Sequence, residues 1–180
     1  MDSYYLITIS KKNDMICRQY CSKKCKMMRL IKNPTGMLES TTSERVQVEY
    51  NRLFLFIGRI SDEKGIRLFC EAISREGYKG IVLGDGYLLG ELRIKYKDII
   101  FKGWCDKEEM MIYLRWARAL VFPSSWYEGA PLVIMEMLQY GIPCIVSDIS
   151  SASEVIDDGK NGYIFKNNDI EALSDAMEKI

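Results

Sequence analysis

Residues 53–83 read LFLFIGRISDEKGIRLFCEAISREGYKGIVL. The stretch opens with the apolar run Leu53–Ile57 and closes with the run Gly80–Leu83, and both have the length and composition of buried strands. Apolar residues between them recur at i, i+3, i+4 and i+7: Ile66, Phe69, Cys70 and Ile73. That period places them on one face of a helix, so the stretch predicts a strand, a helix and a second strand.

The same alternation continues toward the C-terminus. Further strands are predicted at Asp98–Phe101, Ala119–Pro123, Pro143–Ser147 and Gly162–Phe165. The spacing of Met110, Leu114 and Ala117 predicts another helix. Apolar strands alternating with helices indicate an α/β domain with a doubly wound, Rossmann-like parallel sheet, whose crossover helices cover both faces. Ligands of such sheets bind at the carboxyl ends of the strands.

The N-terminal 34 residues differ in kind. They predict a strand at Tyr5–Ile9, a basic helix over residues 11–26 and a strand at Met28–Lys32. They carry a net charge of +6, against −6 for the rest of the chain. Residues 35–50 are polar and predict a linker. Because the whole chain is neutral, nothing global favours a nucleic acid partner.

The composition is that of a folded domain, with 48% apolar and 28% charged residues in a chain of 180. No run approaches the roughly 18 to 20 apolar residues of a membrane span and the start lacks a secretory signal, so we expect a cytoplasmic protein with reduced thiols. Cys17, Cys21 and Cys25 would share one face of a helix. A zinc site needs a fourth ligand and the chain has no histidine, so packed apolar side chains are the favoured interpretation.

The richest motif is FPSSWYEGAPLVIME, residues 122–136, which predicts a strand end, a turn and a helix. Pro131 suits the first helical position, and the free amides of a helix N-terminus favour an anion. Glu128 precedes that terminus, and Glu136 lies about 7 to 8 Å beyond Pro131 along the axis. Carboxylates on either side of an anion site fit a ligand with terminal hydroxyls and central phosphates, such as a sugar nucleotide. A glycosidase carboxylate pair is the competing interpretation.

A second motif, GRISDEKG, occupies residues 58–65 directly after the first buried strand. Its glycines permit close backbone approach, while Arg59 and Lys64 are suited to binding phosphate. Two solvated surface cations are the alternative. A third loop, GDGYLLG at residues 84–90, is one residue longer than the G-x-G-x-x-G dinucleotide motif. It therefore disfavours an NAD-linked oxidoreductase and predicts a tight turn at the mouth of a cleft.

These motifs follow one another in a fixed order along about two thirds of the chain. The segments are Gly58-Arg59 to Lys64-Gly65, Gly84-Asp85-Gly86, Phe101 to Trp104, Phe122-Pro-Ser124, Glu128-Gly129 to Glu136, Gly141-Ile-Pro143, Glu154-Val-Ile and Asn161-Gly162. Their order resembles the C-terminal domain of family 4 retaining glycosyltransferases of the GT-B type. Two stretches depart from the family pattern, Ala130-Pro131 and Asp148-Ile-Ser-Ser, where many members have glycines.

The resemblance implies one half of a GT-B fold, the half that binds the donor. It gives the donor diphosphate to Arg59 and Lys64, the ribose to Glu136, the transferred sugar to Glu128, the phosphates to the Gly129–Leu132 backbone, and the base to the strand end Phe101–Trp104. The implied donor-binding residues are Gly58, Arg59, Lys64, Gly84, Gly86, Gly103, Trp104, Glu128, Gly129, Ala130, Pro131, Leu132 and Glu136. The implied catalytic residues are Glu128, Arg59 and Lys64.

The implied reaction is retaining transfer of a hexosyl-type residue from a nucleotide-diphosphate sugar to a saccharide or lipid-linked acceptor, in surface polysaccharide or glycoconjugate biosynthesis. The leaving diphosphate would help to deprotonate the acceptor, with no metal and no cofactor required. Residues 1–34 would be a remnant of the N-terminal acceptor domain, 35–50 the linker and 51–180 the nucleotide-sugar-binding domain. A missing N-terminal domain or partner chain would then complete the active site.

Two alternatives remain open at this level. The first is a nucleotide-binding interaction module that lacks independent activity. The second concerns the basic segment from Lys11 to Lys32. It is most simply a solvated helix face, and the alternative is a patch that contacts anionic lipid at the inner face of the cell membrane.

Several residues in these motifs also have structural explanations. The spacing of a helical capping box occurs at Ser151 with Glu154, Asp106 with Glu109, and Asn168 with Glu171. Gly141 followed by Pro143 predicts a helix stop that leads into a strand.

Overall fold

The computed structural model describes residues 4–21, 25–31 and 45–180. The strands are β1 (Tyr4–Thr8), β2 (Cys25–Leu30), β3 (Leu53–Ile57), β4 (Lys79–Leu83), β5 (Ile100–Gly103), β6 (Ala117–Phe122), β7 (Cys144–Ser147) and β8 (Gly162–Phe165). The α-helices are α1 (Lys11–Cys21), α2 (Ile66–Glu76), α3 (Leu89–Lys95), α4 (Lys107–Leu114), α5 (Leu132–Gln139) and α6 (Ile170–Glu178). Short 3-10 helices are η1 (Val48–Tyr50), η2 (Asp62–Lys64) and η3 (Ser151–Glu154).

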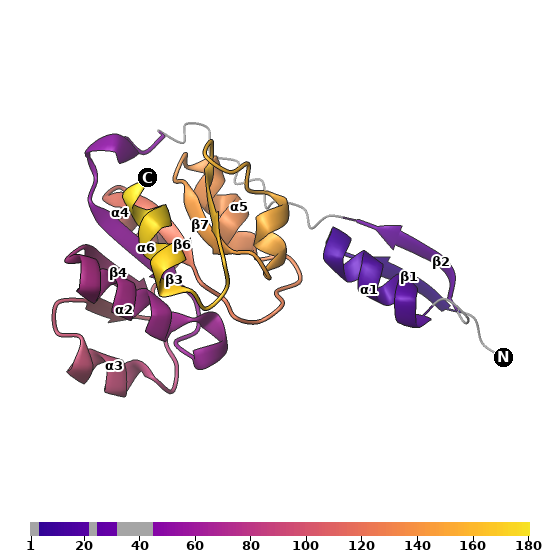
Figure 1. Ribbon diagram of the computed structural model, residues 1–180, viewed down its shortest axis with the longest axis horizontal. Coiled ribbons are helices and arrows are strands. Elements are labelled where there is room, and N and C mark those ends of the chain that lie inside the picture. Colours follow the sequence, from indigo (N-terminus) through magenta and orange to yellow (C-terminus); the bar gives the residue numbers. More distant parts are fainter. Residues whose placement is uncertain (1–3, 22–24, 32–44) are drawn as a thin grey trace.

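Strands β3 to β8 form one parallel sheet in the order β5-β4-β3-β6-β7-β8 (Figure 1). From β3 the chain builds outward through β4 to β5, then returns to place β6 beside β3 and builds outward on the other side. The predicted doubly wound α/β fold is therefore confirmed. The strand order reverses between β3 and β6, and the crevice at their carboxyl ends is where ligands of such sheets bind.

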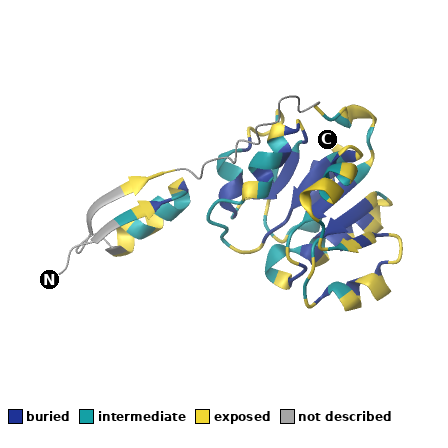
Figure 2. Ribbon diagram, turned by 180° about the vertical axis from the view of Figure 1, so that it is seen from behind, coloured by how far each residue is buried: buried dark blue, intermediate teal, exposed yellow. Residues whose placement is uncertain are grey.

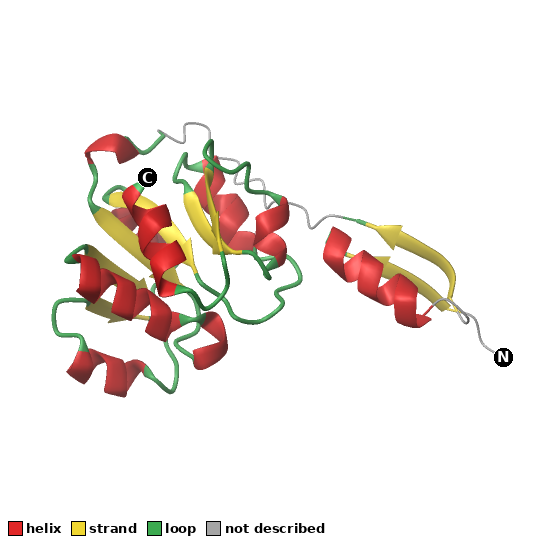
Figure 3. Ribbon diagram, viewed as in Figure 1, coloured by secondary structure: helices red, strands yellow, loops and turns green. Residues whose placement is uncertain are grey.

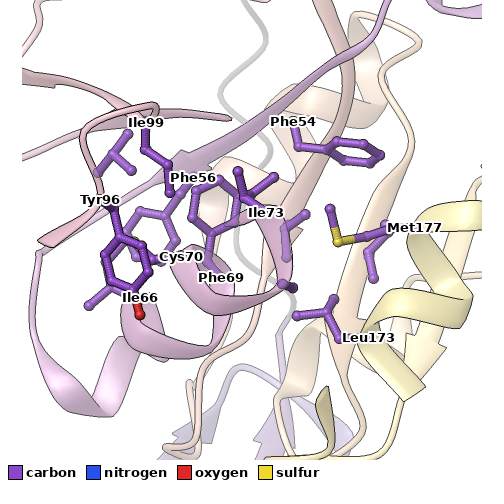
Figure 4. Close-up of a cluster of buried hydrophobic side chains, with 14 of the residues drawn as sticks. Phe54, Phe56, Ile66, Phe69, Cys70, Ile73, Tyr96, Ile99, Leu173 and Met177 are labelled. Carbon is purple, nitrogen blue, oxygen red and sulfur yellow. The ribbon is translucent and has the colours of Figure 1, made fainter. Parts of the chain in front are cut away.

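Helices cover both faces of this sheet (Figure 3), so successive residues of β3 enter different cores. Phe54 and Phe56 pack with α2 and α6, where Phe69 and Leu173 are fully buried (Figure 4). Leu55 points to the other face and packs with residues of α5. The helical face predicted around Phe69 is buried as expected.

The strands predicted at Leu53–Ile57 and Gly162–Phe165 are confirmed to the residue. β5 begins two residues later than predicted, at Ile100. The helix predicted through Ala117 was too long, because α4 ends at Leu114 and Ala117 instead pairs with Leu53 in the sheet. Pairing with the central strand thus outweighs the local helical period.

β1, α1 and β2 form a separate unit at the N-terminal end, in which the two strands pair in parallel and α1 connects them. We call it the N-terminal unit, and residues 45–180 the six-stranded domain. The helix predicted over residues 11–26 was too long, since α1 ends at Cys21 and Cys25 begins β2. The three cysteines therefore do not lie on one helix, which removes the geometry that both the zinc and the packed-face interpretations assumed.

The predicted junction Asn33-Pro34 and most of the predicted linker, residues 35–50, lie outside the described residues. At the end of that linker, Val46 and Val48 pack against the core of the six-stranded domain. The domain boundary at residue 51 stays a prediction.

Of the predicted capping boxes, the one at Asp106 and Glu109 is confirmed at the start of α4. The other two were wrong by one residue. Ser150 rather than Ser151 caps η3, and Asp169 rather than Asn168 caps α6. Asn168 has φ 61° and so lies in the left-handed region, whereas a cap residue needs an extended backbone.

Candidate functional site

The loops that follow β3 and β6 are in backbone contact at the point where the strand order reverses. Gly65 has φ +70°, and a Cβ there would lie 1.9 Å from the carbonyl oxygen of Pro123. The Ser125 amide donates to the carbonyl oxygen of Glu63 over 3.0 Å. Only glycine fits position 65, so the motifs at residues 58–65 and 122–136 form one structural element at the carboxyl edge of the sheet.

The side chains of Lys64 and Glu128 form an ion pair across these two loops. Ser124 is fully buried, and its hydroxyl lies 3.1 Å from both a Glu128 carboxylate oxygen and the Glu63 carbonyl oxygen. Only 24% of the Lys64 side chain and 17% of the Glu128 side chain are exposed. The pair is therefore less screened by solvent than an ordinary surface ion pair. The lysine is held beside Glu128, just before the N-terminus of α5.

The second predicted phosphate cation, Arg59, lies at the rim. Its side chain is 70% exposed, and its Nη1 lies 3.8 Å from an oxygen of Glu63. The pKa of Glu63 is lowered, first by the hydrogen bond from Ser61 and also by the charges of Arg59 and Lys64. The two cations are thus placed differently: Lys64 is half-buried and paired with Glu128, whereas Arg59 is largely exposed to solvent.

The predicted glycines line up across the carboxyl ends of three neighbouring strands. A Cβ at Gly84 would lie 1.9 Å from the carbonyl oxygen of Gly58, and the Gly84 amide donates to the Gly103 carbonyl over 2.7 Å. A Cβ at Gly86 would lie 2.3 Å from the carbonyl oxygen of Ile60. Glycine at positions 84 and 86 therefore lets this loop pack closely against the loop that follows β3, as the prediction of a tight loop at this edge requires.

A polar network that the sequence did not reveal ties the β3 loop to the start of α3. The Tyr87 hydroxyl accepts from the Asp62 amide and donates to the Asp62 carboxylate. Arg67 binds both Asp62 and Glu91. The pKa of Asp62 is lowered, first by the hydrogen bond from Arg67 and then by that from Tyr87. No local signal links residues 62 and 87, because the contact depends on how the sheet brings their loops together.

Pro131 was predicted as the first helical residue of α5. It is instead the N-cap residue, with ψ 112°, and the helix begins one residue later, at Leu132. The Ile134 amide donates to the Pro131 carbonyl. The amides of Leu132 and Val133 come before this first bond of the helix and have no partner within the helix itself. Glu136 lies half-buried in the helix. Within the described part of the chain, no ion pair joins Glu136 to the other predicted site residues.

A cleft of about 290 Å³ lies beside the N-terminus of α5. Its lining residues are Ile9, Ser10, Lys11, Leu30, Ala130, Pro131, Leu132, Met135, Ser151, Ala152, Glu154 and Val155. The N-terminal unit and the six-stranded domain thus both contribute walls. The predicted base-pocket residue Trp104 is exposed at the end of β5 and is not among them.

Residues 41–180 match the family model described as Glycosyl transferases group 1. The chain belongs to this family. It is 28% identical over 142 residues to UDP-Gal:alpha-D-GlcNAc-diphosphoundecaprenol alpha-1,3-galactosyltransferase of Escherichia coli, covering 71% of this chain and 36% of the relative.

A Campylobacter jejuni relative, GalNAc-alpha-(1->4)-GalNAc-alpha-(1->3)-diNAcBac-PP-undecaprenol alpha-1,4-N-acetyl-D-galactosaminyltransferase, is 28% identical over 169 residues, covering 89% of this chain and 47% of its own length. The chain therefore spans between a third and a half of the length of these two relatives.

Among solved structures, Anabaena Alr3699/HepE in complex with UDP superposes with a TM-score of 0.76 over 97% of this chain and 53% of that chain. The two are 16% identical, so this likeness shows the fold alone.

Two features are absent from residues 4–21, 25–31 and 45–180. None of the helices there is both long and apolar enough to cross a bilayer. In the same residues, no three acidic, cysteine or histidine side chains converge as a metal ion would require.

Proposed function

We propose that this chain forms the nucleotide-sugar-binding part of a retaining glycosyltransferase. The reaction transfers a hexosyl-type residue to a saccharide or lipid-linked acceptor in polysaccharide or glycoconjugate biosynthesis. An acceptor-binding domain, in the same protein or in a partner chain, completes the active site. The observation that carries the proposal is the convergence of Lys64 and Glu128 at the β3 and β6 switch point, directly before α5.

In this proposal the donor diphosphate lies against Lys64, Arg59 and the first amides of α5. A lysine ammonium has three donors, so Lys64 can hold Glu128 and still donate to phosphate oxygens. Glu128 binds hydroxyls of the transferred sugar, and Glu136 binds the ribose. As the bond from the anomeric carbon to phosphate breaks, negative charge grows on the diphosphate, and these fixed donors stabilise it. The acceptor oxygen bonds to that carbon on the same face and gives its proton to the diphosphate.

The name of the Escherichia coli relative includes a UDP-Gal donor, and the Anabaena structure is a complex with UDP, so UDP is the first nucleotide to test. A thermal-shift screen against UDP-, GDP- and ADP-sugars identifies the base. Calorimetry with the preferred nucleotide diphosphate then measures affinity. We expect Lys64→Ala to weaken binding at least tenfold, about 1.4 kcal/mol, through loss of a charged phosphate contact.

Lys79→Ala is the matched control, because Lys79 is an exposed lysine at the opposite, amino-terminal end of β4. We expect it to bind like the unchanged chain. Equal affinity of Lys64→Ala and the unchanged chain would contradict the assigned phosphate role.

A further inference from the structure

The N-terminus of α1 is capped by a residue of the six-stranded domain, Glu154 of η3. One Glu154 carboxylate oxygen accepts from the Lys11 amide and the other from the Lys12 amide, each over 2.9 Å. The Asn13 amide donates to the hydroxyl of Ser10, the residue directly before the helix. The first three amides of α1 therefore all have acceptors, and Glu154 supplies two of them from 142 and 143 residues away.

A second contact runs in the opposite direction. The Lys12 ammonium, which belongs to the N-terminal unit, donates to the Asp148 carbonyl over 2.5 Å and to the Ser153 hydroxyl over 3.2 Å. It thus bonds to the loop that leads into η3, the same element that carries Glu154. Glu154 of the six-stranded domain thus accepts from amides of the N-terminal unit, and Lys12 of that unit donates to a carbonyl and a hydroxyl of the domain.

These contacts between α1 and the η3 region lie next to the candidate donor site. Ser10 bonds to the Tyr127 hydroxyl over 2.7 Å, and Ile9 lies 3.0 Å from where a Cβ on Gly129 would be. Tyr127 and Gly129 flank Glu128 in the chain. Ile9, Ser10 and Lys11 also form one wall of the 290 Å³ cleft. The position of the first turn of α1 therefore decides what faces the Tyr127–Gly129 segment.

We propose that Glu154 is a positioning residue whose cap on α1 fastens the N-terminal unit against the Tyr127–Gly129 segment and so sets one wall of the cleft. The sequence suggested that Glu154 starts its own helix with Ser151, but the carboxylate caps α1 instead. Ser151 is left with a buried hydroxyl that has no hydrogen-bond partner. The fastening is independent of the proposed function.

Hydrogen exchange measured by mass spectrometry on the full chain tests the fastening. In Glu154→Ala we expect the amides of the first turn of α1 to exchange at least tenfold faster, with α2 and β3 unchanged in the same sample. Glu154→Gln keeps the side-chain volume and one acceptor oxygen, so it should give a smaller increase. Unchanged exchange in α1 of Glu154→Ala would overturn the proposal.

Glu171→Ala is the matched control. Glu171 also accepts two hydrogen bonds, from Arg75, but this pair lies wholly within the six-stranded domain. We expect it to leave exchange in α1 unchanged. Exchange in α1 that rises equally in both variants would mean that general loosening, not the cap, is responsible, and would overturn the proposal.

The substitution Lys11→Pro tests the same contact from the side of α1. Proline is suited to the first helical position, and it lacks the amide hydrogen that Lys11 donates to Glu154. Both changes break the bond between the Lys11 amide and Glu154. The fold-increase in the exchange rate of α1 amides in the double variant with Glu154→Ala should therefore be smaller than the product of the two single fold-increases. Effects that multiply fully would show that the two residues act separately.

Titration with UDP separates this proposal from the proposed function. The proposed UDP contacts come from the six-stranded domain, so Glu154→Ala should bind UDP within about twofold of the unchanged chain. Absence of UDP binding by the unchanged chain would count against the proposed function and leave the exchange result standing. A tenfold loss of UDP affinity in Glu154→Ala without faster exchange in α1 would contradict the fastening.

Discussion

The six-stranded domain and the N-terminal unit are held in place by different forces. In the domain, apolar residues of the central strands are buried on both faces of the sheet, as with Leu55 and Ile145. In the N-terminal unit, Ile7 is 63% exposed and Tyr20 78% exposed. Figure 2 shows that α1 is mostly coloured as exposed or intermediate. A two-stranded sheet is marginal by itself. The loops of the candidate donor site thus rest on a large core, whereas the N-terminal unit is joined to the domain by polar contacts such as those of Glu154 and Lys12.

The largest expected effect comes from the core of the domain. Leu55→Ala should lower the free energy of unfolding by about 2 to 5 kcal/mol, because it removes a fully buried side chain from a central strand. Ile7→Ala in the N-terminal unit should change it by less than about 0.5 kcal/mol. Urea unfolding followed by circular dichroism measures both. Equal losses would show that the N-terminal unit depends on apolar packing as much as the six-stranded domain does.

A pair of glycines isolates the contact between the two site loops. Gly65 and Gly77 have nearly the same φ, +70° and +68°, but a Cβ at Gly77 meets nothing within 4 Å. Gly77→Ala should cost about 1 to 2 kcal/mol of backbone strain. Gly65→Ala should cost about 1 to 3 kcal/mol more, since Pro123 must move.

Thermal unfolding gives the stability difference between these two variants, and UDP titration shows whether the displaced loop still binds. If both variants lost the same stability, the close approach of residue 65 to Pro123 would be refuted.

The smallest effect is expected from acid. Interactions with Arg67 and with Arg18 lower the pKa of Asp62 and of Asp14 below the ordinary value of 3.8. A lowered carboxyl pKa stabilises the folded state above pH 3.8, and this contribution is lost as the pH falls through the lowered value. Asp62→Asn should therefore reduce the drop in unfolding temperature between pH 6 and pH 3. An unchanged drop would mean that this pair does not contribute.

Much of the fold was predictable because the signals are local. Each strand of the six-stranded sheet is a short apolar run, and the face of α2 repeats at the helical period, so neither needs information from distant residues. Errors occurred where a local sequence pattern is overridden by a distant partner or by the backbone conformation of the residue. Ala117 fits the helical spacing but pairs with Leu53, and the polar spacing at residues 168–171 does not reveal that Asn168 adopts a left-handed backbone.

The candidate site was predictable only in part, for the same reason. The glycines and charges of residues 58–65 and 122–136 were recognised as motifs, because each motif lies within one loop. The hydroxyl of Ser124 between Glu63 and Glu128, and the link from Asp62 to Tyr87, were not foreseen. Both depend on which strands are neighbours in the sheet, and a single sequence does not show that order.

By itself, the sequence determined the alternation of strands and helices, the loops that carry glycine and charge, and the resemblance to a glycosyltransferase family. These features follow from the chemistry of residues close together in the chain. Only the tertiary structure decided that Lys64 pairs with Glu128 and that Glu154 caps α1 rather than its own helix. A carboxylate bonds to whichever free donors the packed backbone brings within about 3 Å, and those donors can come from any part of the chain.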